Sequence, residues 1–284
     1  MIEDKMDKSF QQRREELLKS RLIPKVCPYC KSTKNPSDAL FCNECGSILN
    51  ILPVKAPKGV EAIDLGLPSG TRWANMNVGA TRPEEYGSYF AWGEVEEKEE
   101  YSVRSYTHYE NPFCIHDLAE SICGTPYDVA YMKWGGNWRM PSFEQILELI
   151  DNCTFKWVKL NGINGAKFTS KINKNWFFLP AAGGYVGYWE YLERGYVGDR
   201  GYYWSGTRYP NQPFGEWAHY LSFGERGHWV RAGFYNASTD RHQGFSVRPV
   251  YISSSYMKRR GGDVFNEMPG GHLLKENSEQ QDGE

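Results

Sequence analysis

The chain has 284 residues, a charged fraction of 24% and a net charge of −2. This balance gives no bulk attraction to nucleic acid or to a membrane surface. Aromatic residues make up 15% of the chain and glycines number 29, which favours short strands joined by ordered loops over helix bundles. No apolar run approaches the roughly 18 residues of a membrane span.

Residues 1–24 are highly charged and are predicted to form a short helical leader. Leu17, Leu18 and Leu22 give this helix a narrow apolar edge, and Pro24 ends it. The segment lacks the apolar core of a secretory signal, so a cytoplasmic location is expected.

Residues 25–50 contain two CxxC pairs separated by eleven residues. Four thiolates can surround one zinc ion as a closed tetrahedron, which is typical of a structural site rather than a catalytic one. The alternative, a redox dithiol, is favoured by a single pair in a βαβ setting, which this segment lacks. We therefore predict a zinc ribbon in which the metal supplies folding free energy on the order of 10 kcal/mol. The predicted ligands are Cys27, Cys30, Cys42 and Cys45.

Residues 51–60 contain two prolines and are predicted to be a semi-rigid linker. Residues 61–250 then form a second domain of short strands. A turn at residues 68–70 is expected to join two of them as a hairpin. The pattern predicts strands within residues 61–67, 71–79, 88–94, 155–160, 166–170, 176–182, 202–207, 217–223, 228–235 and 244–250.

One helix is predicted in this domain, over residues 142–152. Ser142 fits the N-cap and Gln145 completes a capping box, while Ile146, Leu149 and Ile150 form the inner stripe. Many short strands with few helices predict an α+β fold with antiparallel sheets. Residues 251–284 have little apolar surface to bury and are predicted to be a disordered tail.

Three further cysteines lie outside the paired set. Cys114, Cys123 and Cys153 are scattered among aromatic segments and are expected to be small buried side chains. A Cys114–Cys123 disulfide is the alternative, and it requires export by an unrecognised route.

Several blocks of the second domain carry a family resemblance. They are VEAIDLGLPSGTRWANMNVGA, YFAWGE, YDVAYMKWGGNWRMPSFEQILELIDNCT, FFLPAAGG, YYWSGT and GFSVRPV. In this order they resemble the Fibrobacter succinogenes major paralogous domain, a family widespread in gut Bacteroidetes and similar to the C-terminal domain of Legionella collagen-like protein. The resemblance covers about residues 60–250 and implies a C-type-lectin-like fold with a loop-rich ligand face. It does not extend to the predicted ribbon or the tail.

Most of these blocks have a structural interpretation. Trp134 and Trp138 flank a glycine turn and are expected to be buried, with Arg139 bonding buried carbonyls or a carboxylate. Residues 203–205 and 245–250 are expected to be paired core strands near the end of the fold.

No catalytic set emerges, and we expect a protein that is not an enzyme. The six histidines show no HExxH spacing, and no GxSxG, Walker A or GxGxxG sequence lies at a strand-to-helix turn. Glu94, Glu96 and Glu97 lack a partner carboxylate in a known geometry. The formylglycine-generating oxidases share the implied fold, but their reactive cysteine pair has no counterpart in a late motif here. The EPN, QPD and WND calcium motifs of lectins are also absent, despite residues 211–213 reading Asn-Gln-Pro.

The segment from residue 208 to residue 242 is the candidate ligand-binding face. Aromatics, arginine and asparagine on glycine-rich loops are enriched at recognition surfaces. Strand alternation would place Trp229 and Arg231 on one face and His228 and Val230 on the other. Ordinary half-buried strand residues are the alternative. The candidate residues are Arg208, Tyr209, Phe214, His228, Trp229, Arg231, Phe234, Tyr235, Asn236, Arg241 and His242.

The sequence therefore predicts a binding protein in which a zinc ribbon tethers a domain that engages a protein or glycan. No nucleic-acid partner and no membrane span are expected. Some C-type-lectin-like proteins are diversified by retroelements, and residues 202–245 occupy the corresponding position. An adenine-mismatched template repeat beside the gene would support that hypothesis. The rival interpretations are an assembly protein without a small ligand and an unrecognised enzyme.

Overall fold

The regular structure consists mostly of short strands with few helices, as the sequence predicted for an α+β fold. The computed structural model describes residues 26–27, 31–35, 39, 42, 44, 49, 55–111, 114–115, 118, 120–188, 191–209, 217–225 and 238–252. Its helices are α2 (Val129–Trp134) and α3 (Phe143–Asn152). Its strands are β1 (Ala62–Asp64), β2 (Arg72–Ala74), β3 (Tyr89–Phe90), β4 (Tyr109–Asn111), β5 (Cys114–Ile115), β6 (Trp138–Arg139), β7 (Cys153–Leu160), β8 (Ile163–Ser170), β9 (Trp176–Pro180), β10 (Gly184–Tyr188), β11 (Tyr191–Gly195), β12 (Arg200–Arg208), β13 (Trp217–Gly224), β14 (Ser238–Asp240), β15 (Phe245–Ser246) and β16 (Val250–Tyr251).

Three predictions concern segments that lie outside these residues. The helical leader over residues 1–24 is wholly outside them. The disordered tail and the strand over residues 228–235 are almost or entirely outside them as well.

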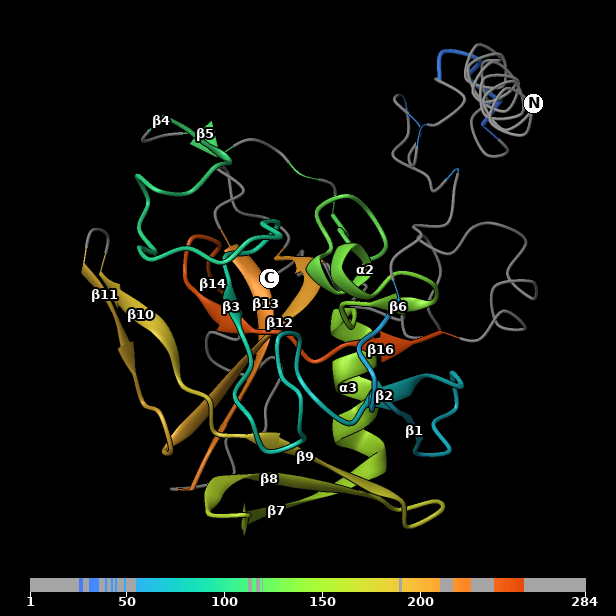
Figure 1. The fold of residues 1–284 in the computed structure, drawn as a ribbon, viewed down its shortest axis with the longest axis vertical. Coiled ribbons are helices and arrows are strands. Elements are labelled where there is room, and N and C mark those ends of the chain that lie inside the picture. Colours follow the sequence, from blue (N-terminus) through green and yellow to red (C-terminus); the bar gives the residue numbers. More distant parts are fainter. Residues whose placement is uncertain are drawn as a thin grey trace, which may run out of the picture.

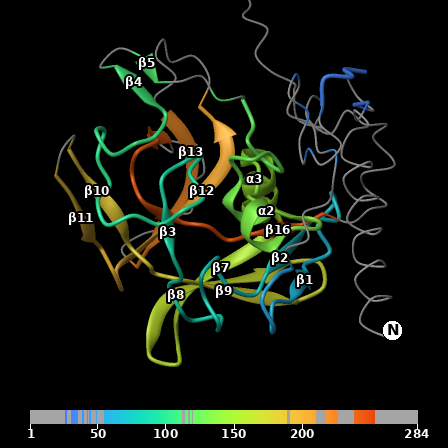
Figure 2. The ribbon, with the colours of Figure 1, turned by 45° about the horizontal axis from the view of Figure 1, so that its top comes forward.

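The largest sheet has the strand order β14-β13-β12-β15-β3. In it β12 pairs with β15 through Tyr203 and Ser246, as predicted for these two segments, but the pair is parallel, not antiparallel as expected. The predicted strand over residues 245–250 is also divided, because Val250 pairs with Trp73 in another sheet. Figures 1 and 2 show helices α2 and α3 on one side of β12 and β13, and the β10–β11 hairpin on the other. The hairpin was not predicted from the sequence.

A second sheet joins the start of the domain to its end. Its order is β1-β2-β16-β6, so the last strand lies between β2 and β6. Strands β1 and β2 are antiparallel, and the Gly70 N–H donates to the Leu67 carbonyl over 2.8 Å in the turn between them. Gly70 has a φ of 72°, which glycine adopts without strain. The predicted hairpin is confirmed.

Helix α3 begins as predicted. The Gln145 N–H donates to Ser142 Oγ over 3.3 Å, and the Ser142 N–H donates to Gln145 Oε1 over 2.9 Å. This reciprocal pair is the capping box expected from the sequence. Ile146 and Leu149 are buried and Ile150 is half-buried, so the helix packs its predicted stripe inward.

Helix α2 was not predicted, and a buried carboxylate organises its start. Asp128 is the N-cap, and its Oδ1 accepts from the Tyr131 N–H over 3.0 Å. Its Oδ2 accepts from the Gly124 N–H over 2.7 Å and from the Met140 N–H over 3.0 Å. One side chain thus fixes a turn, a helix and the end of β6.

The titration of Asp128 should be visible in the stability of the protein. Burial raises the pKa of this carboxyl from 3.8 to about 6, although the hydrogen bonds and the charge of Arg139 act in the opposite direction. The folded state therefore holds this proton more tightly than the unfolded state. The resulting stabilisation is fully present below about pH 4 and is lost as the pH rises through about 6.

The Asp128→Asn variant tests this linkage because its side chain does not titrate. We expect its melting temperature, relative to that of the wild type, to rise between about pH 4 and pH 7. Thermal unfolding followed by circular dichroism at several pH values measures the difference. Parallel curves for the two proteins would contradict the raised pKa.

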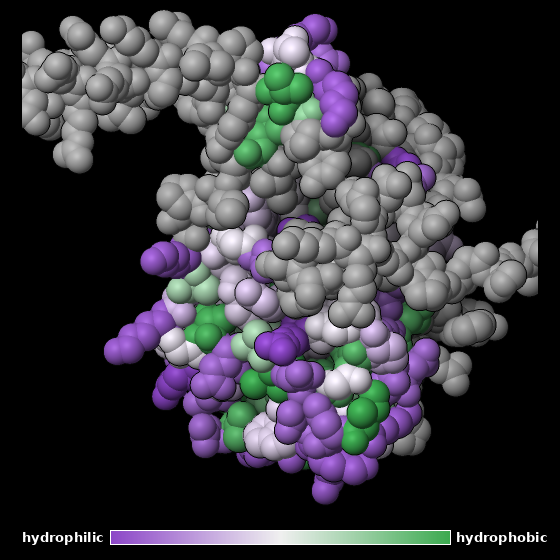
Figure 3. All heavy atoms as spheres, turned by 90° about the vertical axis from the view of Figure 1, so that its right-hand side faces the viewer, coloured by the Kyte–Doolittle hydropathy of each residue, from purple (hydrophilic) through white to green (hydrophobic). Residues whose placement is uncertain are grey.

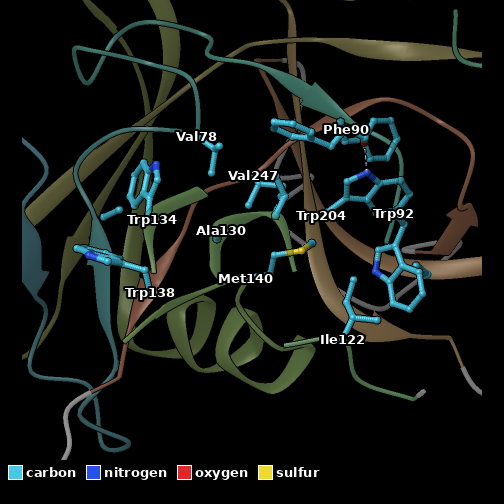
Figure 4. Packing of buried hydrophobic residues seen from close by; sticks show 14 of the residues in the cluster. Val78, Phe90, Trp92, Ile122, Ala130, Trp134, Trp138, Met140, Trp204 and Val247 are labelled. Carbon is cyan, nitrogen blue, oxygen red and sulfur yellow. Dashed lines mark hydrogen bonds between the residues drawn. The ribbon is translucent and has the colours of Figure 1, made fainter. Parts of the chain in front are cut away.

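Tryptophans fill the main core. Trp204 Nε1 donates to the Phe90 carbonyl over 2.8 Å, a bond drawn in Figure 4. Trp134 and Trp138 are buried and their rings meet edge to face at 5.3 Å, which confirms the predicted burial of both. Arg139 is also buried, but its Nε has no hydrogen-bond partner among the described residues. The Nε atom of Arg139 therefore does not make the predicted hydrogen bond to a buried carbonyl or carboxylate.

Two of the three scattered cysteines behave as predicted. Cys123 and Cys153 are free and buried, and burial raises the pKa of their thiols to about 12 and about 11. Because Cys123 is free, the alternative Cys114–Cys123 disulfide is not formed. The burial of the Cys114 side chain lies outside what the structure describes.

Candidate ligand-binding surface and cysteine module

Four of the eleven predicted ligand-binding residues lie in the described part of the chain. They are Arg208, Tyr209, Arg241 and His242. The other seven lie outside it, so the predicted alternation over residues 228–231 is not tested. They are Phe214, His228, Trp229, Arg231, Phe234, Tyr235 and Asn236.

Arg208 and Tyr209 stand at the end of the core strand β12. The Arg208 N–H donates to the Glu120 carbonyl over 2.8 Å, and the Tyr209 N–H donates to the Trp217 carbonyl over 3.0 Å. Both side chains are half-buried. Hydrogen bonds to Glu120 and Trp217 therefore hold the backbone of both residues, while part of each side chain remains accessible.

Tyr209 belongs to a cluster of four aromatic rings, which we call the Tyr209 cluster. Its ring centroid lies 6.1 Å from that of Trp217 and 5.1 Å from that of His219. His219 in turn stacks on Phe143 at 3.8 Å with an interplanar angle of 14°. His219 is buried, whereas Tyr209, Trp217 and Phe143 are half-buried. In this cluster one ring, that of His219, is buried and the other three rings are partly exposed.

Three members of the Tyr209 cluster were missed from the sequence. Trp217 and His219 are two residues apart in β13, so strand alternation places them on one face and could have signalled the pair. Phe143 is the first residue of α3 and comes from a distant part of the sequence. No local signal connects Phe143 with Tyr209.

Arg241 and His242 lie beneath the surface. Arg241 is 0% exposed, and its guanidinium carbon lies 5.2 Å from the centroid of the Trp92 ring. His242 is 4% exposed, and burial lowers the pKa of its imidazole despite the nearby charge of Asp240. The structure therefore does not present these two side chains to a ligand as the sequence predicted.

Half of the predicted zinc site is described. Cys27 and Cys42 are buried, whereas Cys30 and Cys45 lie outside the described residues. The Lys31 N–H donates to the Cys27 carbonyl over 3.0 Å, with Lys31 at a φ of 63°. Cys27 therefore opens a tight turn.

The second cysteine pair shows a contact to sulfur. The Glu44 N–H donates to Cys42 Sγ over 3.4 Å. A backbone N–H directed at sulfur from two residues further on is the kind of outer hydrogen bond that orients a metal ligand. Both described cysteines are thus held by backbone hydrogen bonds within the predicted module.

The early glutamates are engaged with separate partners. Glu94 is buried and pairs with Lys98 Nζ at 2.7 Å, while exposed Glu96 pairs with Lys133 Nζ at 2.7 Å. Glu97 accepts from Ser88 Oγ over 2.5 Å. These contacts do not assemble the three carboxylates into an acid–base pair.

Comparison with known proteins leaves the family of this chain open. No family model matches the chain, and no curated protein or solved structure is significantly similar to it. Among the described residues, no helix is both long enough and apolar enough to cross a membrane.

Proposed function

We propose that the chain is a non-enzymatic binding protein. A zinc ribbon over residues 25–50 tethers a C-type-lectin-like domain over residues 61–250, whose late segment from residue 208 to residue 242 binds a protein or glycan ligand. The Tyr209 cluster carries the proposal, since its partly exposed rings lie at the end of β12, where the half-buried Arg208 precedes Tyr209. The resemblance to the major paralogous domain supports the domain assignment.

The chemistry of this surface suits planar or weakly polar ligand groups. Partly exposed tyrosine and tryptophan rings offer large rigid contact areas, and arginine adds hydrogen-bond donors in a fixed fork. These residue types dominate binding energy at protein interfaces. Because β12 and β13 hold the backbone in place, a ligand would meet a preorganised surface.

The ribbon would have a structural role. Cys27, Cys30, Cys42 and Cys45 would hold the zinc ion, which supplies a cross-link between the two CxxC turns. The buried Cys27 and Cys42 and the N–H contact to Cys42 Sγ support this assignment. A four-sulfur site is closed, so the ribbon itself would contact partners through its surface.

A paired set of variants tests the binding surface. We expect the Tyr209→Ala/Trp217→Ala variant and the Trp229→Ala/Arg231→Ala/Tyr235→Ala variant each to weaken binding at least about tenfold, as removal of an aromatic anchor does. Ligands would first be found on glycan arrays and by pull-down, and affinities then measured by biolayer interferometry. The control is Tyr196→Ala, which removes a tyrosine that is 49% exposed elsewhere.

The same experiment separates the proposal from the assembly interpretation. If both variants fold normally and keep every partner, the late segment does not bind the ligand. Loss of those partners on deletion of residues 1–50 would then assign the interaction to the ribbon.

A further inference from the structure

Strand β7 forms one edge of the three-stranded sheet. It pairs antiparallel with β8 along its whole length, from Cys153 and Ser170 to Leu160 and Ile163, and β9 closes the other side of β8. Figure 1 shows this sheet at the lower end of the molecule with β7 outermost. An eight-residue strand is long for a sheet edge.

The turn between β7 and β8 fixes which backbone groups face outward. Asn161 and Gly162 have φ values of 47° and 88°, the geometry of a two-residue hairpin turn. In such a hairpin Leu160 and Ile163 form a hydrogen-bonded pair. Moving away from the turn, non-hydrogen-bonded and hydrogen-bonded pairs then alternate along the two strands. Phe155, Trp157 and Lys159 consequently direct their N–H and C=O groups away from β8.

These outward groups have no partner in the described chain. No backbone hydrogen bond joins Phe155, Trp157 or Lys159 to any other described segment. Phe155 and Trp157 pack beside Phe223 with ring centroids 6.2 and 6.3 Å away, yet both stay half-buried, and Lys159 is exposed. The edge can therefore accept another extended strand.

The charge of the sheet's own residues is one-sided, although the Glu84 carboxylate accepts from Asn161 Nδ2 over 3.1 Å at the β7–β8 turn. Residues 153–180 contain no aspartate, glutamate or arginine, in a chain with a net charge of −2. None of the lysines in this range forms an ion pair within the described residues. Figure 3 shows hydrophilic side chains over much of this end of the molecule. The lysines are Lys156, Lys159, Lys167, Lys171 and Lys174.

Two of these lysines are placed where they repel each other. Lys156 and Lys167 are directly opposite across β7 and β8, an arrangement that destabilises a sheet. Lys167 Nζ lies 4.1 Å from the ring centroid of Trp176, a side chain that is 46% exposed. The opposed lysines Lys156 and Lys167 therefore do not stabilise the fold, whereas a bound anionic partner would reduce their repulsion.

Lysines on an edge strand also prevent edge-to-edge aggregation. A second copy of β7 would bring Lys156 and Lys159 of both chains together, so the charges disfavour self-pairing. The same charges attract a strand of opposite charge. The alternating N–H and C=O groups of the β7 edge match a polypeptide backbone, which favours an acidic polypeptide over a nucleic acid.

We propose that β7 is a docking edge for an extended acidic polypeptide, which adds as a fourth strand to the β7–β8–β9 sheet. Acidic side chains of the incoming strand would meet Lys156, which is exposed on one face of β7. Apolar side chains would alternate with them and pack on Phe155 and Trp157 on the other face. This surface is separate from the Tyr209 cluster, so failure of one proposal leaves the other standing.

A peptide of about ten residues that alternates glutamate and valine tests the proposal. Its fluorescein conjugate should bind the full-length chain saturably in fluorescence anisotropy at low salt, and more weakly as salt is added. Two N-methylated peptides would then be compared. Methylation of the alternate amides whose N–H groups face β7 should abolish binding, whereas methylation of the other amides should preserve it. Equal effects of the two methylations would overturn strand addition.

Charge reversal supplies the matched protein test. The Lys156→Glu/Lys159→Glu variant should lose at least about tenfold in peptide affinity, and it removes the repulsion with Lys167, so the fold should persist. Lys58→Glu, which alters an exposed lysine before β1, should bind like the wild type. Unchanged affinity in the double variant, or tighter binding of single-stranded DNA than of the peptide, would overturn the proposal.

Discussion

Removal of zinc is expected to unfold the N-terminal module while the domain over residues 61–250 stays folded. A module of this size has too little core to fold alone, so metal binding would supply free energy on the order of 10 kcal/mol. The purified protein should contain about one equivalent of zinc. Chelation should expose residues 25–50 to protease and leave the near-ultraviolet circular dichroism of the tryptophan-rich domain unchanged.

Single cysteine variants give this experiment its control. Cys42→Ser should lose the metal and reproduce the chelated state, because serine cannot replace a thiolate ligand. Cys153→Ala removes a free, buried thiol from the other domain and should retain the full equivalent. Metal content well below one equivalent, with protease resistance unaffected by chelator, would contradict the zinc ribbon. Reversible oxidation of the two pairs would instead support the redox alternative.

Replacing Asp128 with alanine is expected to lower the free energy of unfolding by about 3 to 5 kcal/mol. The carboxylate accepts bonds from the N–H groups of Gly124, Tyr131 and Met140, all of which would lose their partner. The buried Arg139 would also lose its electrostatic interaction with the Asp128 carboxylate. Urea denaturation followed by tryptophan fluorescence measures the change.

Ser142→Ala is the matched comparison for Asp128→Ala. Ser142 also caps a helix, but it is half-buried and its loss should cost only about 1 kcal/mol. The difference between the two variants therefore isolates the effect of burial and of the longer-range bonds. Similar losses for both would show that Asp128 acts as an ordinary helix cap.

Local signals were sufficient to predict the best-defined elements. The capping box of α3 depends on two residues three positions apart, and the β1–β2 turn depends on one glycine. Asp128 differs, because one of its partners is Met140, twelve residues away. The sequence around α2 shows an acidic residue before a short apolar run, which is too weak a pattern to predict a helix of six residues.

The candidate surface was harder to predict for the same reason. Arg208 and Tyr209 follow directly from the end of β12, but Phe143 reaches His219 only through the packing of α3 on the sheet. The burial of Arg241 and His242 likewise depends on neighbours that are distant in sequence. Composition identified a segment rich in recognition residues, but it could not separate buried side chains from accessible ones.

The position of β16 has a consequence for synthesis on the ribosome. Val250 pairs with Trp73 on one side and with Arg139 on the other, so the second sheet is joined by nearly the last described residues. A nascent chain that ends before this strand leaves β2 and β6 without their common neighbour. The second sheet therefore cannot close during synthesis until residue 251 has left the exit tunnel.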